Sequence, residues 1–425
     1  MAQPAALSRR QTVLRALGLG LITGAADDDC SAVGTYAQAG AQLGYGALWI
    51  APALLPMMVT VVYLSGKLGL VTGQGLFTVL RSHSSRWLLY VILIGVIVGN
   101  MIEAGADIGA MAAAFGIFVH LPRWLLILGV SVAALVFQVW GSYTFIRNVL
   151  RVLSLVLLTY IASAFLAHPK LAEVARGTFV PSLHFDRDSL AILVAMIGTS
   201  LSAYLYTWQS NEQVEEKVAA GLHTSAERRG ATKAELRGSL WDVLFGMVFS
   251  SLIMYFIVLA AAATLHASGQ HTIESAAQAA QALRPLAGEA AGLLFAVGLV
   301  GVGFLALPVM TTGAAYDLCQ SLGWKNGLHL KPREAGRFYG AIALFTAIAM
   351  GLNFIGINPM RALVWAGIVQ GFSTPPLMLL IMLLTNRQSI MGERANGRVI
   401  NTLGWVTTGI IFLASVCLVV LWIRH

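Results

Sequence analysis

Three adjacent aspartates stand in the middle of an apolar stretch near the N-terminus. Asp27, Asp28 and Asp29 are preceded and followed by apolar or small residues over the range 12–45. A carboxylate at the centre of a membrane-spanning helix costs about 2.5 to 3.5 kcal/mol, so the helix is expected to open here around a cavity. The alternative is a helix end at the membrane surface, where the three carboxylates would only be solvated. The long apolar flanks favour the opened helix.

A second weak point lies between Gly198 and Ser202, where small and hydroxylated residues cluster within the apolar range 189–212. An opened helix frees backbone carbonyl groups, and such oxygens, with one or two carboxylates, suit a hard divalent cation that retains several waters. The metal ligands predicted from the two breaks are the carboxylate of Asp29, the carbonyls of Ala26 and Thr199, and the hydroxyl of Ser202. For Ser202, packing at a helix contact is an equally good interpretation.

Two further acidic residues lie within a predicted span. Glu103 and Asp107 are at positions i and i+4 and therefore share one helix face. An ionisable pair at that depth indicates either an extension of a cation pathway or a proton route. A structural ion pair with Arg333 or Arg337 is the alternative. The secondary cation pathway predicted from the sequence consists of Asp28, Glu103, Asp107 and Tyr204.

The composition requires a bilayer around most of the chain. Of its 425 residues, 57% are hydrophobic and 11% are charged, with a mean hydropathy of +0.76, which leaves too little polar surface for a soluble globule. The isoelectric point near 9.6 does not indicate nucleic acid as a partner, because the basic residues are scattered between apolar runs. Cys30, Cys319 and Cys417 are far apart, and their spacing indicates neither a disulfide framework nor a zinc site.

Eleven stretches are long and apolar enough to cross about 30 Å of hydrocarbon. They are 12–45, 48–66, 88–114, 123–141, 146–167, 189–212, 239–264, 289–316, 336–355, 361–384 and 401–423. The sequence therefore predicts an all-α integral membrane protein with a single transmembrane domain over residues 1–425. The two breaks fall in the first and sixth spans, which are corresponding positions of two five-helix halves, 12–167 and 189–384, followed by an extra helix at 401–423. This arrangement is typical of an inverted-repeat transporter with its site at the bilayer midplane.

The distribution of basic residues predicts the orientation. With a cytoplasmic N-terminus, all but seven of the 27 lysines and arginines lie on the cytoplasmic side, in accord with the positive-inside rule. The seven on the other side are Arg123, Lys170, Arg176, Arg187, Arg284, Arg361 and Arg424. We therefore expect a multi-pass protein of the plasma (inner) membrane with its N-terminus in the cytoplasm.

The first span carries a spaced motif, which reads Asp29, Thr35, Ala39-Gly40, Gly44-Tyr45 and Leu48-Trp49. This motif resembles the first span of the Nramp family of divalent-metal transporters. The chain departs from the family pattern in spans one and six. Where the family has Pro, Gly and a metal-binding Asn, this chain has Cys30, Ser31 and Ala32, and where the family has Met-Pro-His it has Ser202, Ala203 and Tyr204.

Several other short motifs look more like the Nramp-related magnesium transporters, a divergent branch. They are Asp27-Asp28-Asp29 with Ser31, Gly34-Thr35-Tyr36, Gly198-Thr199, Asn358-Pro359 and Pro375-Pro376. The resemblance implies the LeuT-type fold, with ten core helices plus an eleventh, and alternating access of a metal held by Asp29, the carbonyls of Ala26 and Thr199, and residue 202.

The departures also alter the expected substrate and its coupling. A serine replaces the family's soft thioether, so the preference for transition metals over magnesium is expected to be lost, and Mg²⁺ and Mn²⁺ are the expected ions. Tyr204 replaces the family's histidine and is a poor proton relay at neutral pH, so proton coupling is not expected. The metal is substrate, and no cofactor is expected.

Three other functions are weighed against metal transport. A sodium-coupled carrier of amino-acid-like solutes would use the same fold, but the carboxylate of Asp29 would repel the carboxylate of such a substrate. An intramembrane enzyme is not indicated, because the chain has no HExxH motif and no GxSxG motif with a downstream histidine. A non-transporting receptor is separated from a transporter by a flux assay.

Overall fold

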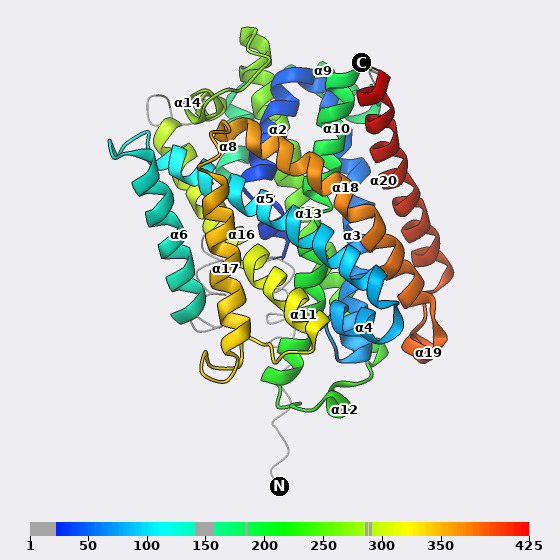
Figure 1. Ribbon diagram of the computed structural model, residues 1–425. Helices are drawn as coiled ribbons and strands as arrows, with labels where there is room; N and C mark the ends of the chain where they lie inside the picture. The colour runs from blue at the N-terminus through cyan, green and yellow to red at the C-terminus, as the bar shows by residue number, and fades with distance from the viewer. Residues whose placement is uncertain (1–22, 141–156, 183–185, 285–287, 289–290, 425) are drawn as a thin grey trace.

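The computed structural model describes residues 23–140, 157–182, 186–284, 288 and 291–424, and the regular elements in these ranges are all helical (Figure 1). A helical turn at 23–27 comes first. The elements that follow are α2 (Cys30–Leu43), η1 (Gly44–Ala47), α3 (Ile50–Thr72), α4 (Leu76–His83), α5 (Arg86–Phe115), α6 (Arg123–Trp140), α8 (Leu158–Leu166), α9 (Leu171–Phe179), α10 (Arg187–Ser200), α11 (Ala203–Ala219), α12 (Ser225–Arg228), α13 (Lys233–Thr264), η3 (His266–Ser268), α14 (Ala276–Ala280), η4 (Gln281–Leu283), α16 (Ala291–Leu322), α17 (Gly336–Leu352), α18 (Pro359–Asn386), α19 (Gln388–Met391), η6 (Gly392–Arg394) and α20 (Arg398–Arg424).

Long apolar helices make up most of the described chain. Seven of them are long and apolar enough to cross a membrane, and two shorter apolar helices, Arg123–Val139 and Gly336–Leu352, accompany them. The predicted all-α, multi-pass architecture is thereby confirmed. The start of the first predicted span and the range 146–156 of the fifth lie outside the described residues.

The first helix break lies at the aspartate run, as the sequence predicts. The helical turn at 23–27 ends before Asp28, and α2 begins at Cys30. Between them Asp29 is extended, with φ −68° and ψ −176°, and its side chain accepts a hydrogen bond from the Ala32 amide. A short polar side chain at this N-cap position satisfies one of the free amide groups of the first helical turn, so Asp29 itself fixes where α2 starts.

The second break lies in the sixth predicted span, between α10 and α11. Ser202 is extended there, with φ −61° and ψ 138°, and its hydroxyl donates to the carbonyls of Gly198 and Thr199, each at 3.0 Å. These bonds satisfy carbonyl groups that the end of α10 leaves without helical partners. Figure 1 shows α10 in the upper half of the bundle and α11 in the lower half, so the break falls between the two halves.

Glycines bring α10 into close contact with α18. A Cβ atom at Gly198 would lie 1.9 Å from the carbonyl oxygen of Gly367 and 2.4 Å from the backbone nitrogen of Gly371. Small residues allow helix backbones in membrane proteins to approach this closely. Because α2 contacts both α10 and α18, and α5 contacts α2 and α18, four helices converge on the two breaks.

Candidate metal site

Asp29 and Tyr204 meet between the two breaks. The Tyr204 hydroxyl donates to the carbonyl oxygen of Ala26 at 2.7 Å and to Asp29 Oδ2 at 3.1 Å. The other carboxylate oxygen, Asp29 Oδ1, accepts from the Ala32 amide at 2.7 Å. Two of the predicted ligands, the Asp29 carboxylate and the Ala26 carbonyl, therefore point to one hydroxyl group, and a cation bound by both would replace these two hydrogen bonds.

Glu103 is the centre of a second cluster of oxygen atoms. Glu103 Oε1 accepts from the Ser31 hydroxyl at 3.0 Å and from the Ser202 hydroxyl at 3.2 Å. The Ser31 hydroxyl also lies 3.0 Å from the Thr199 hydroxyl. The structure thus places the predicted ligand Ser202 beside Glu103, which the sequence places in the secondary pathway. The Thr199 carbonyl, which is the predicted ligand atom of that residue, accepts from the Ser202 hydroxyl at 3.0 Å.

Ser31 links this cluster to Asp107. Its backbone N–H donates to Asp107 Oδ1 at 3.1 Å, and Ser31 lies in the first turn of α2, two residues after Asp29. Asp107 Oδ2 is buried and has no hydrogen-bond partner among the residues that the structure describes. A buried carboxylate oxygen without a partner is costly, so Asp107 has the capacity to bind a proton or a cation.

Gln370, on α18, completes the cluster around Glu103. Its Nε2 atom donates to Glu103 Oε2 at 2.6 Å and to Asn100 Oδ1 at 3.2 Å. Neither Gln370 nor Ser31 was predicted from the sequence as a site residue. The sequence signal for Gln370 was its position as a single glutamine in the middle of an apolar span. A polar side chain at that depth usually faces the inside of the bundle and bonds to another polar group.

The two acidic residues of α5 do not form the alternative ion pair with basic residues near α17. Glu103 and Asp107 are fully buried, whereas Arg333 and Arg337 are exposed. The Arg337 guanidinium lies 4.9 Å from the ring centroid of Trp324. Among the described residues, the structural pairing is therefore wrong.

The three neighbouring aspartates contact two different helices. The Ser250 hydroxyl on α13 donates to Asp27 Oδ2 at 2.7 Å and to Asp28 Oδ1 at 3.2 Å. Asp29 instead faces Tyr204 on α11. Asp28, which the sequence places in the secondary pathway, thus lies next to the predicted ligand but turns toward another helix.

Oxygen atoms dominate the donor set at the two breaks. The carboxylates, carbonyls and hydroxyls described above are hard ligands, and they suit ions such as Mg²⁺ and Mn²⁺ better than soft ions. Within the part of the chain that the structure describes, no group of three or more His, Cys, Asp or Glu side chains could hold a metal ion. The arrangement therefore fits an ion that keeps part of its water shell and uses backbone oxygens.

Comparison with known proteins identifies the family. A family model described as "Natural resistance-associated macrophage protein-like" matches residues 20–421. The chain belongs to the Nramp family. A curated relative, the divalent metal cation transporter MntH of Klebsiella pneumoniae (strain 342), is 25% identical over 386 residues, which cover 89% of this chain and 87% of the relative.

Solved structures share the fold of this Nramp chain. The Eremococcus coleocola manganese transporter, in complex with an aromatic bis-isothiourea substituted compound, has a TM-score of 0.76 at 16% identity and covers 98% of this chain and 88% of its own. The inward-facing conformation of Mhp1 has a TM-score of 0.58 at 15% identity and covers 96% of this chain and 90% of its own. The expected LeuT-type fold is thereby confirmed, while membership of the magnesium branch stays a prediction.

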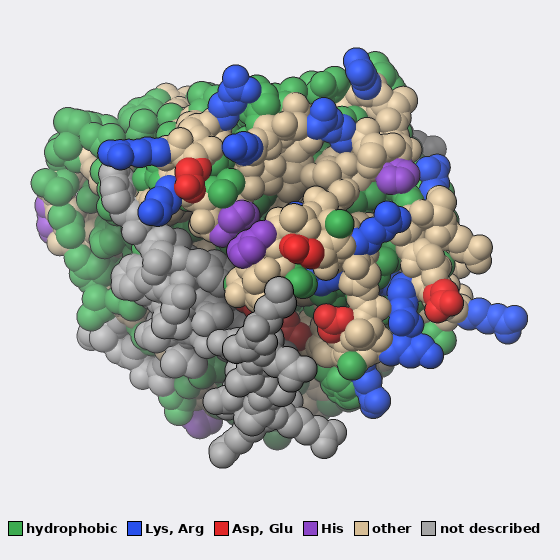
Figure 2. Space-filling model, turned by 90° about the horizontal axis from the view of Figure 1, so that it is seen from below, with side chains coloured by type: hydrophobic (Ala, Val, Ile, Leu, Met, Phe, Trp, Pro, Cys, Tyr) green, Lys and Arg blue, Asp and Glu red, His purple; other side chains and the backbone are tan. Residues whose placement is uncertain are grey.

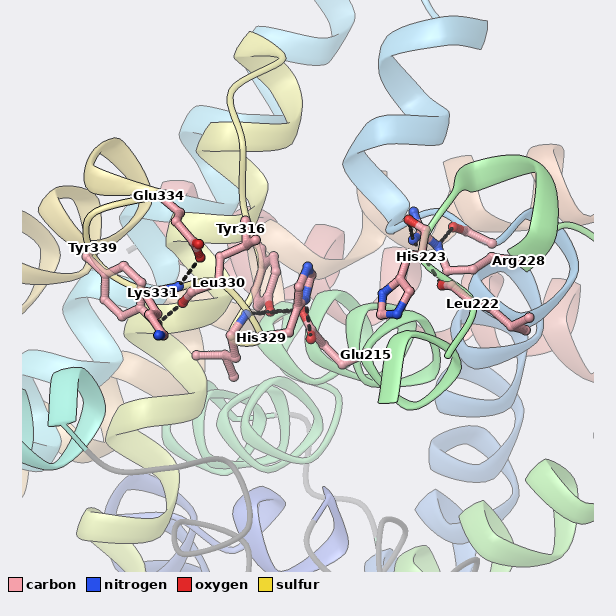
Figure 3. A network of polar contacts seen from close by, with 12 residues as sticks. Glu215, Leu222, His223, Arg228, Tyr316, His329, Leu330, Lys331, Glu334 and Tyr339 are labelled. Carbon is pink, nitrogen blue, oxygen red and sulfur yellow. Dashed lines mark hydrogen bonds and ion pairs between the residues drawn. The ribbon is translucent and has the colours of Figure 1, made fainter. Parts of the chain in front are cut away.

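At the lower end of the Nramp chain, a polar network joins α11 to the segment after α16 (Figure 3). Glu215 Oε1 accepts from the Tyr316 hydroxyl at 2.6 Å and from the Leu328 amide at 3.1 Å. Glu215 Oε2 lies 2.8 Å from His329 Nδ1. The hydrogen bond to Glu215 raises the pKa of His329 above its ordinary value. The charged pair is therefore complete at acidic pH and is lost as the pH rises through this raised pKa.

Proposed function

We propose that this Nramp protein is a secondary transporter or facilitator of divalent metal ions that works by alternating access, with Mg²⁺ and Mn²⁺ as the favoured substrates. The observation that carries the proposal is the fully buried carboxylate of Asp29, which faces the Ala26 carbonyl and the Tyr204 hydroxyl at a helix break. Broken helices at the centre of a LeuT-type bundle are where such folds bind their substrates. The similar proteins named above, a divalent metal cation transporter and a manganese transporter, support the same substrate class.

The roles of the site residues follow from their donor atoms. Asp29 supplies the negative charge that binds the ion. The remaining ligands proposed are the carbonyls of Ala26 and Thr199 and the hydroxyl of Ser202. The residues proposed to attract the cation and bind its waters are Asp28, Glu103, Asp107 and Tyr204. A sodium-coupled carrier of amino-acid-like solutes is a weaker proposal, because the fixed charge of Asp29 would repel a carboxylate.

The proposal places the protein in the plasma (inner) membrane, with the lower end of Figure 1 in the cytoplasm. Figure 2 shows that Lys and Arg side chains are spread over this lower face. Basic residues gather on the cytoplasmic side of membrane proteins, which supports this orientation and a cytoplasmic N-terminus. We propose that residues 1–425 form one transporter domain, with repeats at 12–167 and 189–384 and an extra helix at 401–423.

A flux assay in proteoliposomes tests the proposed function and its coupling. Vesicles with the purified protein and an internal pH dye should take up Mg²⁺ and Mn²⁺ under an imposed negative potential without acidification. The physical reason is that Tyr204, the side chain bonded to Asp29 across the two breaks, has a hydroxyl that stays protonated at neutral pH and therefore neither releases nor takes up a proton as a histidine can. Uptake of an amino acid with sodium, and none of any metal, would contradict metal transport. A stoichiometric proton signal would contradict only uncoupled transport.

Substitution of Ser202 by Met tests the basis of ion selectivity. The Ser202 hydroxyl is a hard ligand, and a thioether in its place favours soft ions such as Cd²⁺. We expect S202M to raise the affinity for Cd²⁺ relative to Mg²⁺ by about tenfold, or about 1.4 kcal/mol, in isothermal titration of both variants. A matched S202A variant separates loss of the hydroxyl from gain of sulfur. If wild type binds Cd²⁺ strongly and Mg²⁺ not at all, the magnesium preference fails.

A further inference from the structure

A polar seam leads away from the candidate metal site toward the lower end of the bundle, between the contacting helices α11 and α16. Residues at helical spacing form one polar face of α11, namely Tyr204, Thr207, Asn211 and Glu215. Backbone carbonyls on this face are already bonded within α11, with Thr207 Oγ1 donating to the Tyr204 carbonyl at 3.0 Å and Asn211 Nδ2 to the Thr207 carbonyl at 2.8 Å. The side chains of this face thus continue from Tyr204, at the metal site, to Glu215, in the network of Figure 3.

The side of α16 that faces this seam is defined by two contacts. A Cβ atom at Gly313 would lie 3.4 Å from the Thr207 hydroxyl oxygen. Gln320 Nε2 donates to Asn211 Oδ1 at 2.6 Å. Asp317 comes four residues after Gly313 and three before Gln320, so helical geometry places it on the same face, between the two contacts.

Asp317 carries an unmatched charge in this seam. Its side chain is fully buried. Among the described residues, neither Oδ1 nor Oδ2 has a well-aligned hydrogen-bond partner, and the Thr207 side chain is the polar group that lies close enough to bond to the carboxyl group. A buried carboxylate in such surroundings is stable only when it takes up a proton or pairs with a cation. The Thr207 hydroxyl is the polar group beside the carboxylate, whereas the amide groups of Asn211 and Gln320 on this face are already bonded to the Thr207 carbonyl and to Asn211 Oδ1. None of these neighbours in the described part of the chain carries a positive charge, so the carboxylate is left to bind a cation or a proton.

We propose that Asp317, together with the Thr207 hydroxyl, forms a second divalent-cation site, which an ion occupies after it leaves Asp29 and before it leaves the protein at the lower end. This inference rests on the proposed metal transport. One carboxylate with a hydroxyl and retained waters suits a hydrated Mg²⁺ or Mn²⁺ ion. Successive sites of moderate affinity allow an ion to be bound and still released. In the structure, Glu215 with Tyr316 and His329 joins the helices below the seam, so the ion leaves when this network opens.

Replacement of Asp317 by Asn tests the second site in the full-length protein. Asn keeps the size of the side chain and removes the charge. We expect the initial rate of Mn²⁺ uptake into proteoliposomes to fall by about tenfold or more, while the affinity of the Asp29 site, measured by isothermal titration with Mn²⁺, changes by less than about threefold. Titration of wild type at millimolar Mn²⁺ should show a second, weaker binding event that D317N lacks. Asp317→Glu, which retains the charge, should restore part of the uptake.

Other outcomes would overturn the inference. Uptake by D317N at the wild-type rate would show that Asp317 is not on the pathway. Equal loss of uptake and of the tight binding event would assign Asp317 to the Asp29 site. The exposed Glu393 at the same end of the molecule provides a control, because E393Q should leave both measurements unchanged. A wild type that carries no divalent metal would instead refute the proposed function, so the two failures are distinguishable.

Discussion

Replacement of Asp29 by Asn is expected to abolish divalent-metal binding while the fold stays intact. The Asn side-chain oxygen can still accept the hydrogen bond from the Ala32 amide that caps α2, a bond of 2.7 Å in wild type. The variant loses the negative charge of the carboxylate, which replaces water ligands that the ion gives up when it binds. We expect the affinity for Mn²⁺ and for Mg²⁺, measured by isothermal titration, to fall by at least about a hundredfold, or about 2.8 kcal/mol. The melting temperature should stay close to that of wild type.

Two matched variants distinguish the ligand role of Asp29 from its structural role. Asp28→Asn removes a charge that is just as deeply buried but faces Ser250 on α13, so it should weaken binding much less. Asp29→Ala removes the helix cap as well as the charge, and the cap alone is worth about 0.5 to 2 kcal/mol. We therefore expect D29A, but not D29N, to lower the melting temperature. A larger loss of affinity in D28N than in D29N would mean that Asp28 is the ligand.

Both helix breaks could be predicted because their causes are local. The run Asp27-Asp28-Asp29 cannot face lipid, and the hydroxylated residues near Ser202 compete for backbone hydrogen bonds within a few residues of themselves. The structure shows both effects directly, since Asp29 caps α2 and the Ser202 hydroxyl bonds to carbonyls at the end of α10. Local signals of this kind do not depend on which helices become neighbours.

The composition of the cluster around Glu103 could not be predicted, because it depends on which distant helices meet. Glu103 bonds to Ser31, 72 residues away in the chain, and to Gln370, 267 residues away. A similar limit applies to Asp317, which follows the predicted span 289–316 directly. A charged residue there indicates a span end, but α16 continues to Leu322 and buries this carboxylate. Helix packing, which the sequence pattern does not encode residue by residue, decides both cases.

Replacement of Glu103 by Gln should strongly reduce transport. A second substitution tests whether the lost charge or the changed hydrogen bonds are the cause. In wild type, Glu103 Oε1 accepts from Ser31 and Ser202, and Oε2 accepts from Gln370 Nε2 at 2.6 Å. In E103Q the amide oxygen can still accept from Gln370 if its NH₂ group faces the Ser31 and Ser202 hydroxyls, which must then turn to accept; in the other orientation two NH₂ groups oppose each other. Such a mismatch or rearrangement at a buried site costs up to about 1 to 3 kcal/mol. We expect a modest fall in melting temperature and at least about a tenfold loss of Mn²⁺ uptake.

The double variant E103Q with Gln370→Glu separates the hydrogen bonds from the charge. A carboxylate at position 370 accepts from the new amide at 103, so the pairing is complementary again and the melting temperature should recover. The negative charge, however, then lies on α18 instead of beside the Ser31 and Ser202 hydroxyls. If the charge of Glu103 binds the waters of the passing ion, uptake should stay low in the double variant. Full recovery of uptake together with stability would show that Glu103 only holds α5 and α18 together.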